Sequence, residues 1–320
     1  MWKTVLRRVI IMVPQIIILS MLVFIIAKLM PGDPFTGLMG PETDPNRIEE
    51  LREAAGLNDP WYQQYARWVS NAVHGDLGKS YTYQRSVTSL IGERALNTFY
   101  LSLVAMILTY LIAIPLGLLA GRYQDSRLDR GIVFYNFLSM AIPPFVFGLI
   151  LIYVFGYKLG WVPTSGSVDV LTEKGTFSYY WDKLYHIITP AITMAVLGTY
   201  TIIQYLRSEI IDSKNQDYVK TARSKGLPMN KVYTRHIFRN SLIPIAAGLG
   251  FTITGLLGGT IFIETIFSYP GMGELFMSSI ASRDYSVITA LIVLYGFLGL
   301  LGSMLSDIIL SIVDPRIRID

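Results

Sequence analysis

Few residues in this chain have the type and spacing needed for catalysis, and none of them completes a site. Gly78-Lys79-Ser80 ends like a phosphate-binding loop, but that motif also needs a glycine at position 73, where the chain has Val73. The three histidines, His74, His186 and His236, form no His-Glu-x-x-His zinc motif, and no Gly-x-Ser-x-Gly nucleophile turn is present. We therefore expect no enzymatic activity, no metal site and no cofactor in this chain.

The strongest functional pattern lies in the basic segment 207–241. At 100° per residue, Tyr218, Val219, Ala222 and Gly226 fall on one narrow face of a short helix. Small residues on a helix face allow another chain to approach closely. The pattern predicts a helix that docks in a groove on a cytosolic partner, and a helix resting on anionic lipid is the alternative.

The composition indicates where such a segment would be anchored. The 320 residues include 52% hydrophobic and only 16% charged side chains, whereas soluble proteins carry about a quarter charged residues. The chain contains no cysteine, which excludes a disulfide scaffold, an iron–sulfur protein and a cysteine-ligated zinc site. A sequence pI near 9.0 is compatible with nucleic-acid or membrane binding. The apolar excess favours the membrane, and we expect no nucleic-acid partner.

The apolar residues are concentrated in six runs, each about as long as the ~20 residues that cross a bilayer. These runs cover residues 9–30, 98–121, 132–156, 187–206, 242–263 and 287–306. Five of them contain no Asp, Glu, Lys, Arg or His, and the first holds only Lys28, near its end. The sequence therefore predicts an all-α integral membrane protein with six transmembrane helices.

Loop charges predict the orientation of these helices. With both termini in the cytoplasm, the cytoplasmic segments carry 16 Lys and Arg against 8 Asp and Glu, and the outer segments carry 11 against 15. Positive charge accumulates on the cytoplasmic side of membrane proteins. We therefore expect both termini to be cytoplasmic, with membrane lipid around the spans.

We divide the chain into three regions on these patterns. Residues 1–97 comprise the first span and a long extracytoplasmic loop, 31–97. Residues 98–309 form a core of five spans that includes the loop 207–241, and residues 310–320 form a cytoplasmic tail.

Polar residues inside the uncharged spans are candidates for the lining of a translocation path. They are Thr193, Thr199, Tyr200, Gln204, Thr252 and Thr254. Ion-coupled carriers usually keep ionisable residues within the membrane, so the uncharged spans favour a pathway whose free energy comes from a cytosolic ATPase. A secondary transporter or a channel is the alternative.

The segment Asp217-Tyr-Val-Lys-Thr-Ala222-Arg-Ser-Lys-Gly226, closed by Leu242-Ile243-Pro244, resembles the coupling loop of ABC importer permeases. Lys220 and Thr221 stand where the general pattern has Glu and Ala, whereas Ala222 and Gly226 match it. The spacing between the glycine and the proline is that of the oligopeptide, dipeptide and nickel branch. The resemblance assigns the ATPase contact to Asp217, Tyr218, Val219, Ala222, Gly226 and Pro244.

The resemblance to this branch extends over nearly the whole chain. Its marks, in order, are Met30-Pro-Gly-Asp-Pro34, Gly56-Leu-Asn-Asp-Pro60, Gly75-Asp-Leu-Gly-Lys-Ser80, Phe267-Ser-Tyr-Pro-Gly-Met-Gly273, Arg283-Asp-Tyr285 and Asp314-Pro-Arg316. The chain is similar to the B-type permease subunit of peptide importers, which carries a long outer loop after its first span.

This resemblance implies a type I ABC importer permease fold, with a coupling helix between the fourth and fifth spans, in a bacterial or archaeal cytoplasmic membrane. It also implies a second permease as heterodimer partner, two cytosolic ATPase subunits that bind ATP and Mg²⁺, and an extracytoplasmic peptide-binding protein. The implied substrates are oligopeptides or dipeptides, and nickel chelates or another small solute are the alternative.

Overall fold

The computed structural model describes residues 2–29, 49–50, 52–53, 56 and 58–313. The predicted outer loop between 30 and 48, the tail from 314 onward, and the Pro-Gly-Asp-Pro and Asp-Pro-Arg marks lie outside the described residues. Within the described part all regular structure is helical, apart from one isolated β-bridge between Lys79 and Ser86. The predicted all-α fold is confirmed.

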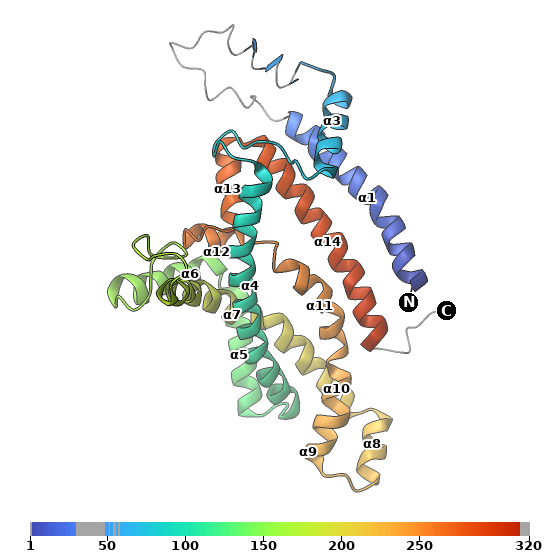
Figure 1. Cartoon of the computed structure of the whole chain (residues 1–320). Helices are drawn as coiled ribbons and strands as arrows, with labels where there is room; N and C mark the ends of the chain where they lie inside the picture. The colour runs from blue at the N-terminus through green and yellow to red at the C-terminus, as the bar shows by residue number, and fades with distance from the viewer. Residues whose placement is uncertain (1, 30–48, 51, 54–55, 57, 314–320) are drawn as a thin grey trace.

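The helices follow one another along the chain as drawn in Figure 1. They are α1 (Trp2–Leu29), α3 (Trp61–Val73), α4 (Val87–Arg122), α5 (Arg127–Ala141), α6 (Pro144–Leu151), the π-helical segment η2 (Ile152–Lys158), α7 (Phe177–Lys214), α8 (Asp217–Ser224), α9 (Met229–Val232), the π-helical segment η3 (Tyr233–Ile237), α10 (Phe238–Ser241), α11 (Ile243–Gly255), α12 (Ile261–Ile266), α13 (Met272–Ser282) and α14 (Tyr285–Val313).

Four of these helices, α1, α4, α7 and α14, are long and apolar enough to cross a membrane without a break. Two bent pairs of helices also pass this test, and each forms a broken span or a re-entrant loop. The segment Arg127–Ala141 meets Pro144–Lys158 at 98°, and Met229–Ser241 meets Ile243–Gly255 at 48°. The described residues therefore contain four continuous candidate spans, and the predicted total of six is reached if each bent pair is one span.

Prolines account for both breaks. Pro143 and Pro144 follow Ile142, whose backbone is extended, because a residue before proline is disfavoured in the helical region. Pro244 lies in the first turn of α11, where its missing N–H costs no hydrogen bond. The predicted span 242–263 is not one helix, since α11 ends at Gly255 and α12 begins only at Ile261.

Small residues allow the central helices to approach closely. Gly117 and Gly121 of α4 face Leu206 and Ile210 of α7, and a Cβ on Gly121 would lie 2.7 Å from the Cβ of Ile210. Gly250 of α11 abuts the α14 backbone in the same way, with no room for a side chain. The core of the bundle is thus built on α4 against α7 and on α11 against α14 (Figure 1).

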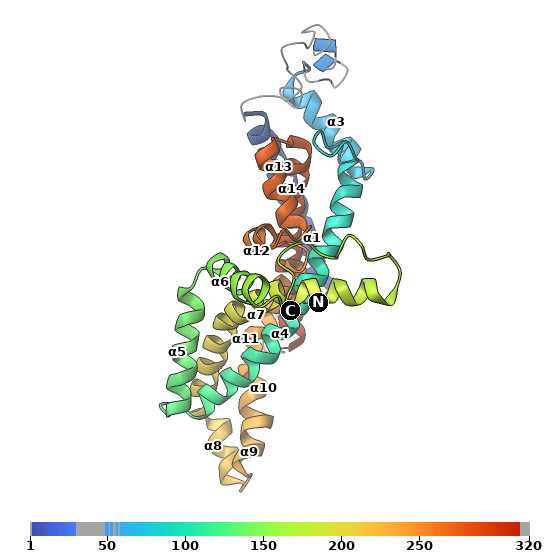
Figure 2. The same ribbon diagram turned by 90° about the vertical axis from the view of Figure 1, so that its left-hand side faces the viewer.

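The molecule is elongated, with α3 at one end and α8 with α9 at the other (Figures 1 and 2). We call these the α3 end and the α8 end. Helix α1 lies along α14, and Arg8 pairs with Asp307 at 2.5 Å. Figure 1 shows that α1 begins and α14 finishes on the side of the bundle that faces the α8 end.

Candidate functional site

Helix α8 is a two-turn helix that projects from the α8 end of the bundle (Figure 1). Asp217 lies in its first turn, where a negative charge is favourable, and accepts a hydrogen bond from Lys220 at 2.9 Å. This bond lowers the pKa of the Asp217 carboxyl. The chain leaves the helix through Gly226, whose φ of +75° is a conformation that favours glycine.

The apolar face of α8 packs against this chain. Val219 and Ala222 are 3% and 4% exposed and contact a cluster that contains Leu206 of α7 and Tyr233 of η3. Ile114 and Leu118 of α4 pack against the same cluster. Because α8 itself lies on α9 and η3, an inward displacement of α8 would reach α4 and α7 through this cluster.

The burial of Val219 and Ala222 corrects the expectation that this face is turned toward a partner. Tyr218 is half-buried, and Gly226 is exposed. The other exposed residues of the helix and its C-terminal turn are Asp217, Lys220, Thr221, Arg223, Ser224 and Lys225. The side of α8 available to another protein is thus polar and mainly basic, and the contribution of the predicted residues to coupling stays a prediction.

A buried ion pair connects the helices just above α8. Arg207 of α7 donates two hydrogen bonds, at 2.7 and 2.8 Å, to the two carboxylate oxygens of Asp129 in the first turn of α5. Asp129 is 2% exposed and also accepts the backbone N–H of Asp125 at 2.8 Å. This two-pronged geometry fixes the orientation of α5 relative to α7.

A second set of polar contacts joins the end of α4 to the segment after α8. The Arg122 guanidinium donates to the Asn230 side chain at 2.7 Å and lies over the Tyr233 ring, 4.9 Å from its centroid. The Lys214 ammonium at the end of α7 donates to the Arg122 carbonyl at 3.1 Å. Sequence reasoning missed both sets, although all these charges flank predicted spans.

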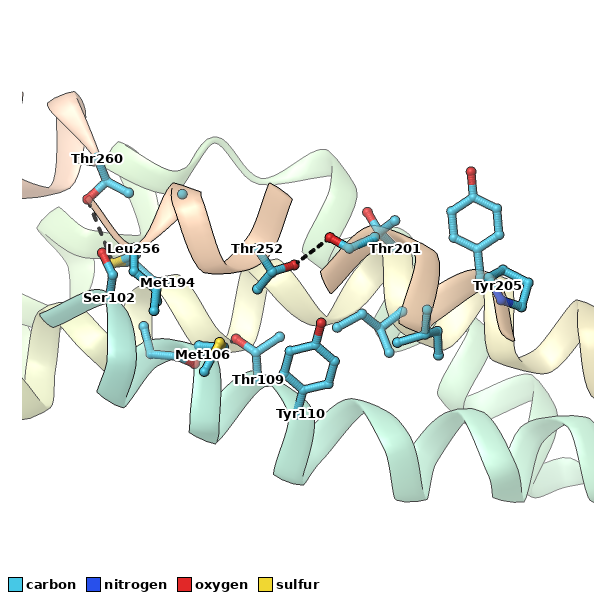
Figure 3. A pocket seen from close by; sticks show the side chains of 17 residues that line it. Ser102, Met106, Thr109, Tyr110, Met194, Thr201, Tyr205, Thr252, Leu256 and Thr260 are labelled. Carbon is cyan, nitrogen blue, oxygen red and sulfur yellow. Dashed lines mark hydrogen bonds between the residues drawn. The ribbon is translucent and has the colours of Figure 1, made fainter. Parts of the chain in front are cut away.

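A cavity of about 450 Å³ lies between α4, α7 and α11. Met106, Thr109 and Tyr110 extend from α4 toward Thr201 of α7 and Thr252 of α11, and the Thr252 hydroxyl donates to the Gly248 carbonyl of its own helix at 3.2 Å (Figure 3). None of the residues that line this cavity is acidic or basic. The walls therefore offer hydroxyls and apolar surface, without a fixed charge.

Of the six predicted path residues, only Thr252 lines this cavity. Thr193, Thr199 and Thr254 are buried, and each donates its hydroxyl to a carbonyl of its own helix. Tyr200 is half-buried, and the exposed Gln204 accepts a 3.4 Å hydrogen bond from Asn136. Pro244 lines the cavity, and its predicted part in the ATPase contact stays a prediction.

Four residues of α7 that line the cavity lie on one face of the helix. A selection by residue type does not reveal this shared face. Met194, Gly198, Thr201 and Tyr205 are separated by four, three and four positions, which places them on one face. Sorting polar residues by face would have found Thr201 and Tyr205. Selecting them by type alone favoured threonines that bond to their own helix.

A fully buried carboxylate, also missed, fixes the hairpin of α12 and α13 on α4. Glu264 accepts hydrogen bonds from the Thr98 hydroxyl at 2.9 Å and from the Gly273 N–H at 2.6 Å. The N–H groups of Thr260 and Glu274 add two longer ones, at 3.3 and 3.2 Å. Glu264 lies one residue beyond the predicted span 242–263, so the search for charges within the spans did not include it.

Two family models together match nearly the whole chain. Residues 113–319 match the binding-protein-dependent transport system inner membrane component family, and residues 1–103 match the N-terminal region of the same kind of membrane component.

Curated relatives match over their full lengths. The chain is 41% identical to the oligopeptide transport system permease protein AppB of Bacillus subtilis (strain 168), over 98% of both chains. It is 32% identical to the glutathione transport system permease protein GsiC of Escherichia coli (strain K12), over 99% of both. It is also 34% identical to a putative peptide transport system permease protein of Brucella abortus (strain 2308), over 100% of both.

Among solved structures, an inward-facing form of the MetNI methionine ABC transporter has the same fold. The TM-score is 0.52 at 14% sequence identity, over 70% of this chain and 96% of the other. This likeness supports the predicted type I importer permease fold. The chain belongs to the binding-protein-dependent transport system inner membrane component family and is a membrane permease of an ABC importer.

Proposed function

We propose that this chain forms one half of a membrane path for oligopeptides or dipeptides, and that a second permease supplies the other half. Two cytosolic ATPase subunits bind ATP and Mg²⁺ and carry out the hydrolysis, and an extracytoplasmic binding protein delivers the peptide. The α8 end faces the cytoplasm, as do both termini, and the α3 end faces outward. The loop charges and the peptide-transporting relatives support this assignment.

One observation carries the proposal: α8 packs its apolar face on α9 and η3, in a hydrophobic cluster that includes Leu206 of the cavity-walling helix α7, and exposes its charged face beyond the bundle. A partner that moves α8 would move α4 and α7 through the shared cluster around Leu206. The Asp129–Arg207 pair would carry the same motion into α5. Helix α8 thus has the contacts expected of a coupling helix.

The chemistry of the cavity suits a peptide in transit. Peptides of different sequence share a backbone of hydrogen-bonding groups and differ in side-chain charge. A hydroxyl such as that of Thr201 can exchange hydrogen bonds with a backbone, and uncharged walls hold no particular peptide tightly. We expect substrate selection to lie mainly in the binding protein.

Ser224 and Ser178 provide a matched pair of variants to test the coupling contact. Both serines are exposed, Ser224 in α8 and Ser178 in the first turn of α7. Ser224→Trp places a bulky ring on the exposed side of α8 without disturbing its packed side. In the assembled importer in proteoliposomes, we expect Ser224→Trp to abolish peptide-stimulated ATP hydrolysis and Ser178→Trp to preserve it.

Normal stimulation in Ser224→Trp would refute the docking of α8 on an ATPase. Ala222→Glu is a poorer test, because that carboxylate would be forced into the buried cluster and would disturb α8 itself. The substrate class is tested separately, by loading the binding protein either with peptides or with a non-peptide solute. If only the non-peptide solute stimulates ATP hydrolysis, the proposed peptide substrate is refuted and the coupling role of α8 is not.

A further inference from the structure

A second cavity, of about 580 Å³, lies at the α3 end, away from the proposed path. It is lined by the last turns of α1, by α3, by the loop around Lys79, by the first residues of α14 and by four residues between positions 49 and 58. Its volume falls within the range of small-molecule sites, about 300–1,000 Å³. The proposed coupling and translocation make no use of this cavity.

The cavity wall has an excess of positive charge. Arg67 and Arg52 line it and are paired with Asp59 and Glu49, respectively. Lys28 and Lys79 also line it, and neither pairs with a carboxylate among the residues that the structure describes. Two lysines that line one cavity, with no carboxylate paired to either of them in the described part of the chain, favour an anionic ligand.

The position of Lys28 places this charge at the edge of the membrane. Lys28 is in the last turn of α1, whose apolar span runs from Val5 to Leu29. Beside it, Ile26 and Leu29 are 60% and 78% exposed, as expected for side chains that face acyl chains. The cavity therefore begins where the hydrocarbon layer ends.

The remaining walls are those of an interfacial site. Trp68, Tyr81 and Tyr285 line the cavity, and such amphipathic rings concentrate at the level of lipid headgroups. Phe24 contributes an apolar wall and packs against Trp68, with ring centroids 6.4 Å apart. A basic cavity attracts anionic groups, and the adjoining apolar surface of α1 can accommodate acyl chains.

We propose that this cavity binds the phosphate group of an anionic phospholipid, with Lys28 and Lys79 as its cationic ligands and the acyl chains lying along the exposed side of α1. This proposal is independent of the transported substrate and of which side of the membrane the α3 end faces. A bound lipid would connect α1, α3 and α14, which meet around the cavity.

The test uses the full chain in its importer complex, purified in detergent and incubated with phosphatidylglycerol or phosphatidylcholine. Native mass spectrometry then counts the lipids retained on the permease. We expect one retained phosphatidylglycerol and no comparable retention of phosphatidylcholine. Lys28→Gln and Lys79→Gln should each lower phosphatidylglycerol occupancy about fivefold, from roughly 1 kcal/mol per lysine. Lys79→Arg should retain the lipid.

Lys174→Gln is the control, because Lys174 is exposed and lines neither of the two cavities. Equal retention of both lipids would overturn the proposal, and so would an equal effect of Lys174→Gln and Lys79→Gln. A competition experiment with glycerol 1-phosphate distinguishes a phospholipid headgroup from a soluble phosphate ester as the source of the phosphate. If glycerol 1-phosphate binds with the same lysine dependence and displaces the lipid, a soluble phosphate ester, and not a phospholipid, is the ligand.

Discussion

Replacing Arg207 with glutamine should destabilise the protein through the carboxylate that it leaves behind. Asp129 is 2% exposed and would lose both hydrogen bonds from the guanidinium, keeping the Asp125 N–H. Removing one partner of a fully buried pair costs roughly 3–5 kcal/mol. The Arg207 side chain is 23% exposed, so water can partly replace it, and we expect a loss of about 2–3 kcal/mol.

A double-mutant cycle separates the pair from its surroundings. Arg207→Gln leaves the Asp129 carboxylate unpaired, and Asp129→Asn removes that charge. The double variant should therefore lose less free energy of unfolding than the two single variants together. We expect an interaction energy of about 1–2 kcal/mol. The free energy of unfolding is measured by titration with a denaturing detergent in mixed micelles.

The neighbouring Arg130 provides the control. It is exposed and makes only a 3.4 Å hydrogen bond to the Asp125 carbonyl, so Arg130→Gln should change the free energy of unfolding by less than about 0.5 kcal/mol. Equal losses for Arg207→Gln and Arg130→Gln would refute the pair as a structural link. An additive cycle would refute it as well.

Three further predictions concern the packing of the bundle and the cavity. Gly250→Ala should cost about 1–3 kcal/mol, because a Cβ there collides with the Ser306 backbone. Gly248→Ala should be nearly neutral, because a Cβ there meets no heavy atom within 4 Å. Equal thermal unfolding midpoints for the Gly250→Ala and Gly248→Ala variants would contradict the close crossing of α11 and α14. Glu264→Leu should cost roughly 2–4 kcal/mol, since it leaves buried donors unpaired, and a loss below about 1 kcal/mol in the same unfolding assay would disprove that role. Thr252→Trp should reduce peptide uptake by filling the cavity, and unchanged uptake would exclude the cavity from the path.

Hydropathy was sufficient to predict the four continuous spans and their order, because charge-free runs of this length are rare in the cores of soluble proteins. The prolines at 143, 144 and 244 were visible as well, but their effect depends on the neighbouring helices. Pro115 and Pro190 lie inside helices that remain unbroken. A proline therefore marks a possible bend, and the surrounding packing decides whether the bend forms.

The existence of α8 was predictable, but the direction of its apolar face was not. A face formed by Val219 and Ala222 can pack on another protein or on its own chain, and the residue pattern is the same in both cases. The cavity was missed for a similar reason. A threonine such as Thr193 satisfies its hydroxyl within the helix, so polarity inside a span does not by itself indicate a path.

The most direct test of the coupling role of α8 exploits the absence of cysteine from the chain. Ser224→Cys and Ser178→Cys each introduce a single thiol with almost no change in volume. In the assembled importer, a short bifunctional thiol reagent should crosslink Ser224→Cys to an ATPase subunit that carries a cysteine in its docking groove, and the yield should change on ATP binding. Ser178→Cys should give no such product. No ATPase crosslink from Ser224→Cys, or equal yields from both positions, would contradict the account.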